Sequence, residues 1–211
     1  MHILSKELLF PNPVQASPEG LLAIGGDLSI ERLLLAYNSG IFPWYSEEEP
    51  ILWWSPDPRM VLFPEELKVS KSMKQLLKKE VFQVTYNTCF ERVIENCAKI
   101  YRPDQEDTWI TLEMIEAYKG LHRLGIAVSV EVWKEDELVG GLYGIDLKDK
   151  KIFCGESMFS KVSNASKYGF ICLVEKLKQQ DYRLIDCQVH TDHLESLGAK
   201  EIDREVFLSY L

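Results

Sequence analysis

Two polar residues near the end of one predicted strand are the first candidates for chemistry. Residues 184–190 read as a strand on which Asp186 and Gln188 share one face, while Ile185 and Cys187 share the other. A carboxylate and an amide side by side are poor core residues, and a carboxylate in such a place is a candidate for proton transfer. An edge strand with a polar outer face accounts for the same pattern, so the pattern leaves both interpretations open.

A second candidate carboxylate lies in the segment FCGESMFS, residues 153–160. Strict alternation would place Phe153 and Gly155 on one face and Cys154 and Glu156 on the other. A Glu among buried apolar groups needs a partner or a function, because an unpaired buried charge is costly. A Glu that caps the following loop is the alternative.

A lysine-rich helix is the third feature. Residues 70–79 form a predicted helix capped by Ser70, and no acidic residue lies between positions 68 and 79, although the chain is acidic overall. The spacing puts several lysines on one helical face, which could contact a phosphate backbone or could simply be solvated. The lysines concerned are Lys68, Lys71, Lys74, Lys78 and Lys79.

Tryptophans crowd into proline-containing segments, with Trp44 in GIFPW and Trp53 and Trp54 in WWSPDPR, and a further one, Trp109, lies in TWIT. Aromatic residues usually build the core, but tryptophans in such loops also suit stacking on a nucleobase. The pattern alone does not decide which of them stack.

Metal and nucleotide-hydrolysis sites are not indicated. Cys187, His190, Asp192 and His193 are close in sequence, but HxxH after a strand is a weak signal and no second clustered pair completes a tetrahedral site, so we expect no metal. No G-x-x-x-x-G-K-[ST] motif occurs. The segment before the helix near residue 163 also lacks the glycine-rich loop by which GNAT acyltransferases hold the pyrophosphate of coenzyme A.

The elements that must position these residues fall into two parts. Residues 1–58 are rich in Pro and Gly and show one convincing helix, capped by Ser29 and ended by Gly40, which predicts a small irregular N-terminal domain. From residue 59 to residue 211, strands alternate with helices around a central hairpin at 138–156. This order predicts an α+β domain whose mixed sheet carries helices on both faces, as in a three-layer α/β/α GNAT-like acyltransferase.

Composition sets the remaining limits. Among 211 residues, 24 are Lys or Arg and 33 are Asp or Glu, and a formal net charge of −9 argues against a general nucleic-acid binder. Five scattered cysteines indicate a reducing environment. The N-terminus does not resemble a signal peptide, and no apolar run approaches the ~20 residues that span a bilayer. We therefore expect a cytoplasmic protein without a membrane anchor.

Several segments together resemble the bacterial leucyl/phenylalanyl-tRNA–protein transferase family. In chain order they are EGLLAIGGDL at residues 19–28, GIFPW at 40–44, WWSPDPR at 53–59, TWIT at 108–111, FCGESMFS at 153–160, NASK at 164–167, LIDCQ at 184–188 and SLGA at 196–199. They cover almost the whole chain. The chain departs from some members by ending soon after residue 207 and by having Leu142 where they have Met.

This resemblance implies an aminoacyltransferase that moves Leu or Phe, with Met as an additional donor, from charged tRNA to the N-terminal α-amine of proteins beginning with Arg or Lys. Such proteins are marked for N-degron-dependent degradation. The resemblance implies a catalytic centre of Asp186, Gln188 and Glu156, adenosine binding by Trp44 and Trp109, and contact of the lysine helix with the tRNA acceptor stem. No cofactor is required, and we expect a monomer.

The expected mechanism is attack of the amine on the ester of aminoacyl-tRNA. Asp186 acting with Gln188 would orient and deprotonate the amine, and Glu156 would position substrate groups. An apolar pocket of Leu142, Phe153, Met158 and Ile185 would receive the donor side chain. A coenzyme-A-dependent N-acetyltransferase and a non-catalytic tRNA-binding module are the alternatives.

Overall fold

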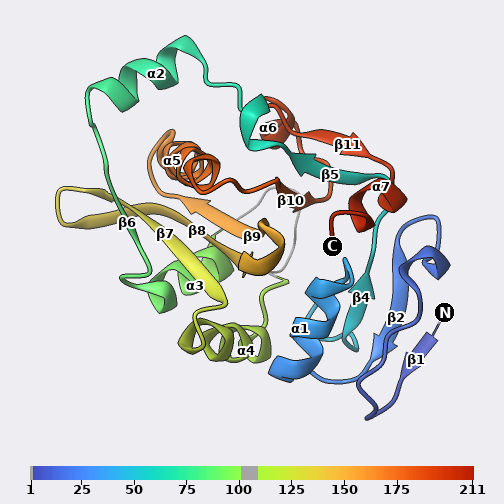
Figure 1. Ribbon diagram of the computed structural model, residues 1–211. Coiled ribbons are helices and arrows are strands. Elements are labelled where there is room, and N and C mark those ends of the chain that lie inside the picture. The colour runs from blue at the N-terminus through green and yellow to red at the C-terminus, as the bar shows by residue number, and fades with distance from the viewer. Residues whose placement is uncertain (1, 101–108) are drawn as a thin grey trace.

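A seven-stranded mixed sheet forms the centre of the larger part of the molecule (Figure 1). The computed structural model describes residues 2–100 and 109–211. The strand order is β11-β5-β10-β9-β8-β7-β6, and β9 and β10 run parallel while the other neighbours are antiparallel. The strands are β5 (Arg59–Leu62), β6 (Gln83–Tyr86), β7 (Ala127–Lys134), β8 (Glu137–Leu147), β9 (Ile152–Ser160), β10 (Leu184–Gln188) and β11 (Lys200–Ile202).

Helices cover both faces of this sheet. A side chain at Gly140 would meet Ala165 of α5 (Ala165–Gln179), whereas one at the next residue, Gly141, would meet Val93 of α3 (Phe90–Lys99). Because successive strand residues point to opposite faces, α5 and α3 lie on opposite sides. The remaining helices of this part are α2 (Lys71–Lys78), α4 (Leu112–Arg123), α6 (Asp192–Glu195) and α7 (Arg204–Leu208), with 3₁₀ turns at Pro64–Glu66 and Lys148–Lys150. The predicted mixed α+β architecture is confirmed.

The N-terminal part contains a second sheet that the sequence analysis did not predict. Its order is β1-β2-β4-β3, with β1 paired parallel to β2. The strands are β1 (His2–Leu4), β2 (Leu21–Gly25), β3 (Phe42–Pro43) and β4 (Leu52–Trp54), accompanied by a 3₁₀ turn at Pro13–Gln15 and by α1 (Ile30–Asn38). These strands have two to five residues between Pro- and Gly-rich turns, so they offered no clear periodicity. This small N-terminal domain is therefore a sheet and a helix and not an irregular lobe.

Two large apolar cores and a small third cluster of Val132, Val139 and Ala165 hold the described elements together. Residues of the N-terminal part such as Leu22, Leu33 and Trp53 share one core with α3, α4 and the face of the large sheet beneath them. The second core lies on the other face, between the sheet, α5 and α2. Both parts of the chain are thus joined by buried apolar contacts, which fixes α1 close to α4.

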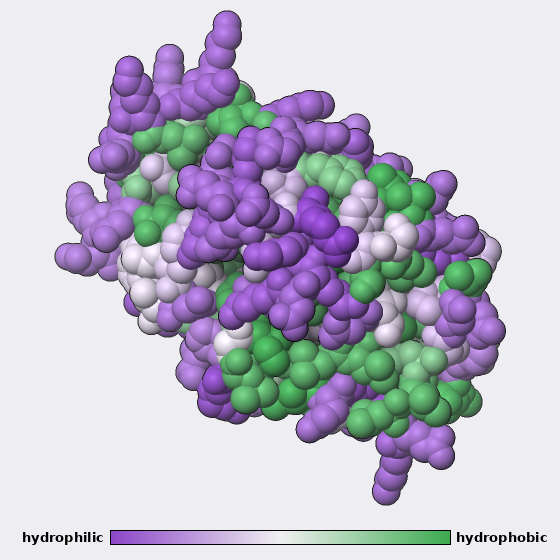
Figure 2. All heavy atoms as spheres, in the orientation of Figure 1, coloured by the Kyte–Doolittle hydropathy of each residue, from purple (hydrophilic) through white to green (hydrophobic). Residues whose placement is uncertain are grey.

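The surface view shows how the residue types divide (Figure 2). On this face, hydrophilic side chains cover the region of α2, α5 and α6, and hydrophobic side chains gather below, over α1 and its neighbours. Within the part of the chain that the structure describes, every helix is too short or too polar to cross a bilayer.

Candidate active site

A cavity opens where the pairing of β9 and β10 ends. The two strands pair only from Leu184 opposite Ile152 to Asp186 opposite Cys154, and beyond this point β10 continues beside β5. The cavity has a volume of about 330 Å³, within the usual range of small-molecule sites. It is lined by Phe42, Pro43, Trp44, Trp109, Leu142, Tyr143, Phe153, Gly155, Glu156, Ser157, Met158, Phe170, Ile185, Cys187, Gln188, Val189, Thr191, His193 and Leu194.

The apolar wall of this cavity contains the four predicted side-chain pocket residues. Leu142 of β8 pairs with Met158 of β9, while Phe153 and Ile185 are opposite each other on β9 and β10. Leu142, Phe153 and Ile185 are buried and Met158 is partly buried. The structure therefore brings these four residues together around one apolar space.

A bulge in β9 turns Glu156 into the cavity. Tyr143 pairs with Ser157, but the next residue, Gly144, pairs with Gly155, so Glu156 is the extra residue. The alternation expected from the sequence fails here. Glu156 lines the cavity together with Gly155 and Phe153, whereas Cys154 does not. A bulge beside a site is a common way to redirect one side chain.

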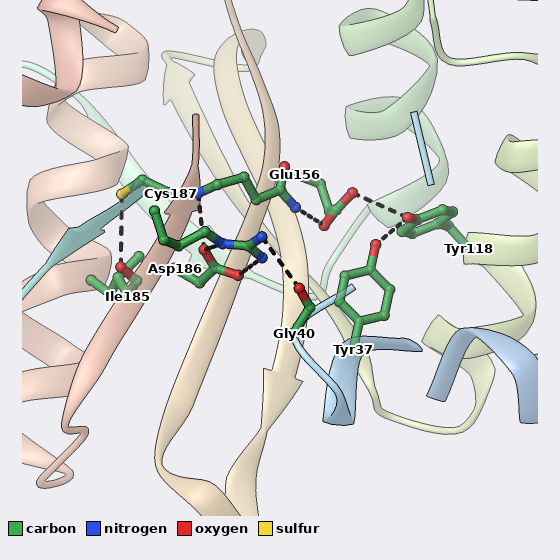
Figure 3. A network of polar contacts seen from close by, with 9 residues as sticks. Tyr37, Gly40, Tyr118, Glu156, Ile185, Asp186 and Cys187 are labelled. Atoms are coloured by element: carbon green, nitrogen blue, oxygen red, sulfur yellow. Dashed lines mark hydrogen bonds and ion pairs between the residues drawn. The ribbon is translucent and has the colours of Figure 1, made fainter. Parts of the chain in front are cut away.

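Glu156 has hydrogen-bonding partners on both of its oxygens (Figure 3). Gln188 Nε2 donates to Oε1 at 2.8 Å, and the Tyr118 hydroxyl donates to Oε2 at 3.1 Å. The Tyr118 hydroxyl is in turn hydrogen-bonded to the hydroxyl of Tyr37 from α1. Burial raises the pKa of Glu156 from 4.5 to about 7; the negative charge of Asp186 adds to this rise, and the hydrogen bonds from the two tyrosines and Gln188 oppose it. This carboxyl group can therefore gain or lose a proton near neutral pH.

Gln188 reaches Glu156 through an unusual backbone conformation. The register of β10 against β5 shifts between Asp186 and Gln188, and Gln188 has a φ of 65°, which is rare for a residue with a side chain. Its backbone N–H donates to Asp186 Oδ1 at 2.9 Å, which holds this conformation. As a result Gln188 lines the cavity alongside Cys187 and Ile185, and the expectation that Gln188 shares a face with Asp186 is wrong.

Asp186 lies behind the cavity and forms a buried ion pair. Its side chain is 1% exposed and is absent from the cavity wall. Arg59 Nε donates to Oδ1 at 2.8 Å and Nη2 to Oδ2 at 2.7 Å, while Nη1 donates to the carbonyl of Gly40 at 3.3 Å. The guanidinium also packs over the rings of Phe42 and Phe207. Both charges are thus fully bonded, as a buried pair requires.

The tryptophans separate into two groups. Trp44 and Trp109 line the cavity, and Trp44 is 37% exposed with its ring tilted against that of Trp54. Trp53 is fully buried and donates from Nε1 to the carbonyl of Gly25 at 2.8 Å, so it belongs to the core. Thr108, which begins the TWIT segment, lies outside the described residues.

The lysine helix lies apart from the cavity, at the upper left of Figure 1. Ser70 accepts a hydrogen bond from the N–H of Met73 at 3.2 Å, which confirms the predicted cap. No carboxylate of the described residues forms an ion pair with these lysines, which leaves their charges available to an anionic partner. All five side chains are exposed: Lys68, Lys71, Lys74, Lys78 and Lys79.

The four residues considered for a metal site in the sequence do not all lie together in the structure. His190 and Asp192 lie with Glu195, their ligand atoms all within 4.8 Å of one another, but all three are exposed. His190 Nε2 is 3.3 Å from Glu195 Oε2, which is an ordinary surface contact. Cys187 and His193 stand outside this group, and burial raises the pKa of the Cys187 thiol, which disfavours the thiolate that binds metals.

Sequence reasoning missed Arg59, Tyr37 and Tyr118 as parts of the site. Arg59 is the last residue of the WWSPDPR segment, and a buried carboxylate at Asp186 requires a cation, so this partner could have been sought. Nothing in the spacing of Tyr37 and Tyr118 singles them out, because both occupy ordinary positions on the buried faces of α1 and α4.

Comparisons with known proteins identify the family of this chain. The family model described as leucyl/phenylalanyl-tRNA protein transferase matches residues 61–211, and the model of that family's N-terminal domain matches residues 26–57. Leucyl/phenylalanyl-tRNA–protein transferases of Flavobacterium johnsoniae and Christiangramia forsetii are 63% and 60% identical to this chain over its full length. The matched regions cover 99% and 100% of those two proteins. That of Syntrophobacter fumaroxidans is 56% identical over 99% of this chain and 88% of its own length. This chain belongs to the leucyl/phenylalanyl-tRNA–protein transferase family.

Proposed function

We propose that this chain transfers Leu or Phe, with Met as an additional donor, from aminoacyl-tRNA to the N-terminal α-amine of proteins that begin with Arg or Lys. The acceptor is thereby marked for N-degron-dependent degradation. The observation that carries the proposal is the apolar cavity with Glu156 and Gln188 hydrogen-bonded in its wall, in a chain of this family.

The reaction exchanges an ester for an amide. The neutral α-amine attacks the carbonyl carbon of the aminoacyl ester, the C–N bond forms, and the ribose oxygen leaves and takes up a proton. The amine must lose a proton, and because its reference pKa is about 7.7–8.0, a large share is protonated near pH 7. The amide product is more stable than the ester, so the transfer needs no nucleoside triphosphate.

We assign the proton acceptor role to Glu156 and a positioning role to Asp186. Glu156 lines the cavity with a pKa of about 7, which suits a general base. Asp186 is buried with both oxygens bonded to Arg59, and it acts through the N–H of Gln188. The sequence-based hypothesis gave these two carboxylates the opposite roles. Gln188 then holds Glu156 in place through the 2.8 Å bond from its amide.

The donor side chain fits the apolar wall formed by Leu142, Phe153, Met158 and Ile185. Leu and Met side chains adapt to a leucyl or a benzyl group. Branching at Cβ would be disfavoured by sterics, although the discrimination per methylene is only ~1–3 kcal/mol.

Other residues suit the adenosine and the acceptor stem of the donor tRNA. We propose that Trp44 and Trp109 hold the terminal adenosine, since both line the cavity and aromatic rings stack on bases. The exposed lysines of the α2 region would meet the acceptor stem. We further propose a GNAT-like domain from residue 59 to residue 211 preceded by a domain of residues 1–58, and a monomer in the cytoplasm, where the five free thiols stay reduced.

The test is transfer from a labelled donor. The purified chain is incubated with ¹⁴C-Leu-tRNA and a peptide with N-terminal Arg, and we expect label in the peptide. The same peptide with an acetylated N-terminus should take up none, because it lacks the nucleophile. Binding of acetyl-CoA without any transfer from Leu-tRNA would instead support the acetyltransferase alternative, and tRNA binding without transfer would support a non-catalytic module.

A further inference from the structure

A histidine in the cavity wall has a nitrogen without a partner. His193 lines the cavity from α6, and its Nε2 is buried with no hydrogen-bond partner among the described residues. Leaving such a polar atom unpaired is costly, so a native site of this kind commonly meets its partner in a ligand. The mechanism proposed above does not use His193.

A lysine without an acidic partner lies close to this histidine. Lys167 is the third residue of α5 and precedes Phe170 by three positions, so the two share a helical face, and Phe170 lines the cavity. Burial lowers the pKa of His193, and the positive charge of Lys167 lowers it further, so the two groups are within electrostatic range of each other. Lys167 is partly buried, and no carboxylate of the described residues pairs with it.

The chemical groups of the aminoacyl-tRNA donor and of the acceptor can be compared as ligands for Lys167 and His193. The donor α-amine and the acceptor residue are cationic or neutral, and Lys167 repels a cation. The donor side chain is apolar and belongs with Leu142 and Met158. The adenine and ribose are neutral. The remaining group is the phosphodiester on the 5′ side of the terminal adenosine, which carries a negative charge that a lysine and an imidazole N–H both bind.

We infer that Lys167 and His193 form a subsite for the phosphodiester that joins the last two nucleotides of the donor tRNA. Lys167 supplies the charge, and His193 donates from Nε2 to a phosphate oxygen. This inference rests on the proposed function, because it takes aminoacyl-tRNA as the donor. The subsite would fix the 3′ end of the tRNA while the lysines of α2 meet its stem.

Three donors of increasing size test the inference. Phe-tRNA and a Phe-charged CpA dinucleotide both contain the phosphodiester, whereas Phe-adenosine does not. Lys167→Gln should raise the KM about 10- to 100-fold for the first two, as expected for loss of a charged contact, and should leave transfer from Phe-adenosine unchanged. Removing one phosphate contact should also reduce the salt dependence of tRNA binding, with the slope of log K against log salt falling by about 0.7.

Matched variants separate this role from a general loss of charge. Lys6→Gln removes an exposed lysine of the N-terminal part and should leave the KM for the dinucleotide donor at the wild-type value. His193→Leu should raise the KM for the dinucleotide donor, and His193→Gln, which keeps a donor near the position of Nε2, should restore most of the affinity.

Two outcomes would overturn the inference. One is an equal effect of Lys167→Gln on Phe-adenosine and on the dinucleotide, and the other is no effect on either. Both differ from a failure of the proposed function, in which the wild-type protein itself transfers from none of the three donors.

Discussion

Replacing Glu156 by Gln should stabilise the protein in a pH-dependent way while removing its activity. Glu156 is held in the cavity wall, where burial raises the pKa of its carboxyl group from 4.5 to about 7. The charged form is therefore disfavoured in the folded state. Gln has nearly the same shape, its carbonyl oxygen can accept from Gln188, and its amide can donate to the Tyr118 hydroxyl.

The size of the stability difference follows from the raised pKa of Glu156. A rise in the pKa of about 2.5 corresponds to at most about 3.5 kcal/mol, because one pH unit is worth about 1.4 kcal/mol. Since the folded-state pKa of Glu156 is raised, the folded protein binds this proton more tightly than the unfolded chain. The stabilisation that comes from this tighter proton binding is fully present below pH 4.5, and it is lost as the pH rises to about 7. Glu156→Gln should therefore match wild type near pH 4.5 and exceed it by up to about 3.5 kcal/mol at pH 8.

Urea unfolding of both proteins at several pH values measures this difference directly, and calorimetry should show a gain of about 6–12 °C in Tm at pH 8 for a chain of this size. Transfer from Leu-tRNA at the same pH should fall by about 10²- to 10⁴-fold, because the amide cannot accept the proton. Glu201→Gln, at an exposed position of β11, is the control. A stability difference that does not change between pH 4.5 and pH 8 would refute the raised pKa and with it the assignment of the base.

Four further changes test other parts of the site. Asp186→Ala leaves Arg59 buried without its counter-ion, so we expect a loss of about 3–5 kcal/mol in urea unfolding, and Arg59→Met in the same chain should recover part of it. Tyr118→Phe removes a hydrogen bond that favours the ionised Glu156, so the acidic limb of the pH–rate profile should move to higher pH; an unmoved limb would contradict the contact. Trp44→Ala should raise the KM for aminoacyl-tRNA by about 5- to 150-fold through the loss of ~1–3 kcal/mol of stacking, with little change in kcat. Leu142→Ala enlarges the apolar pocket and should shift the ratio of kcat/KM for Phe-tRNA over Leu-tRNA by at least about tenfold toward Phe, and an unchanged ratio would place the side chain elsewhere.

The regular elements of the large sheet could be predicted because their signals are local. Ser29 and Ser70 each accept a hydrogen bond from the helix they begin, and those helices end within two residues of the predicted ends. The hairpin strands β8 and β9 and the strand β10 were also predicted, although β9 runs four residues beyond its predicted end. The four apolar pocket residues were also named in advance, and they line one cavity.

The polar details of the site could not be predicted, because they depend on two irregularities. A bulge at Glu156 and a register shift with positive φ at Gln188 both break the alternation from which side-chain directions were inferred. The partner of Asp186 was missed for a different reason, since Arg59 is 127 residues away in sequence. A single amino-acid sequence carries no signal of spacing for such a long-range pair.

The position of β10 in the sheet has a consequence for how the chain is made. This strand lies between β5 and β9, yet it is the next-to-last strand to be synthesised. Until residues 184–188 have left the ribosome, the edges of β5 and β9 have no neighbour, and exposed strand edges invite pairing with other chains. Completion of the large sheet must therefore wait for nearly the whole polypeptide, and a product that stops before Leu184 is expected to aggregate.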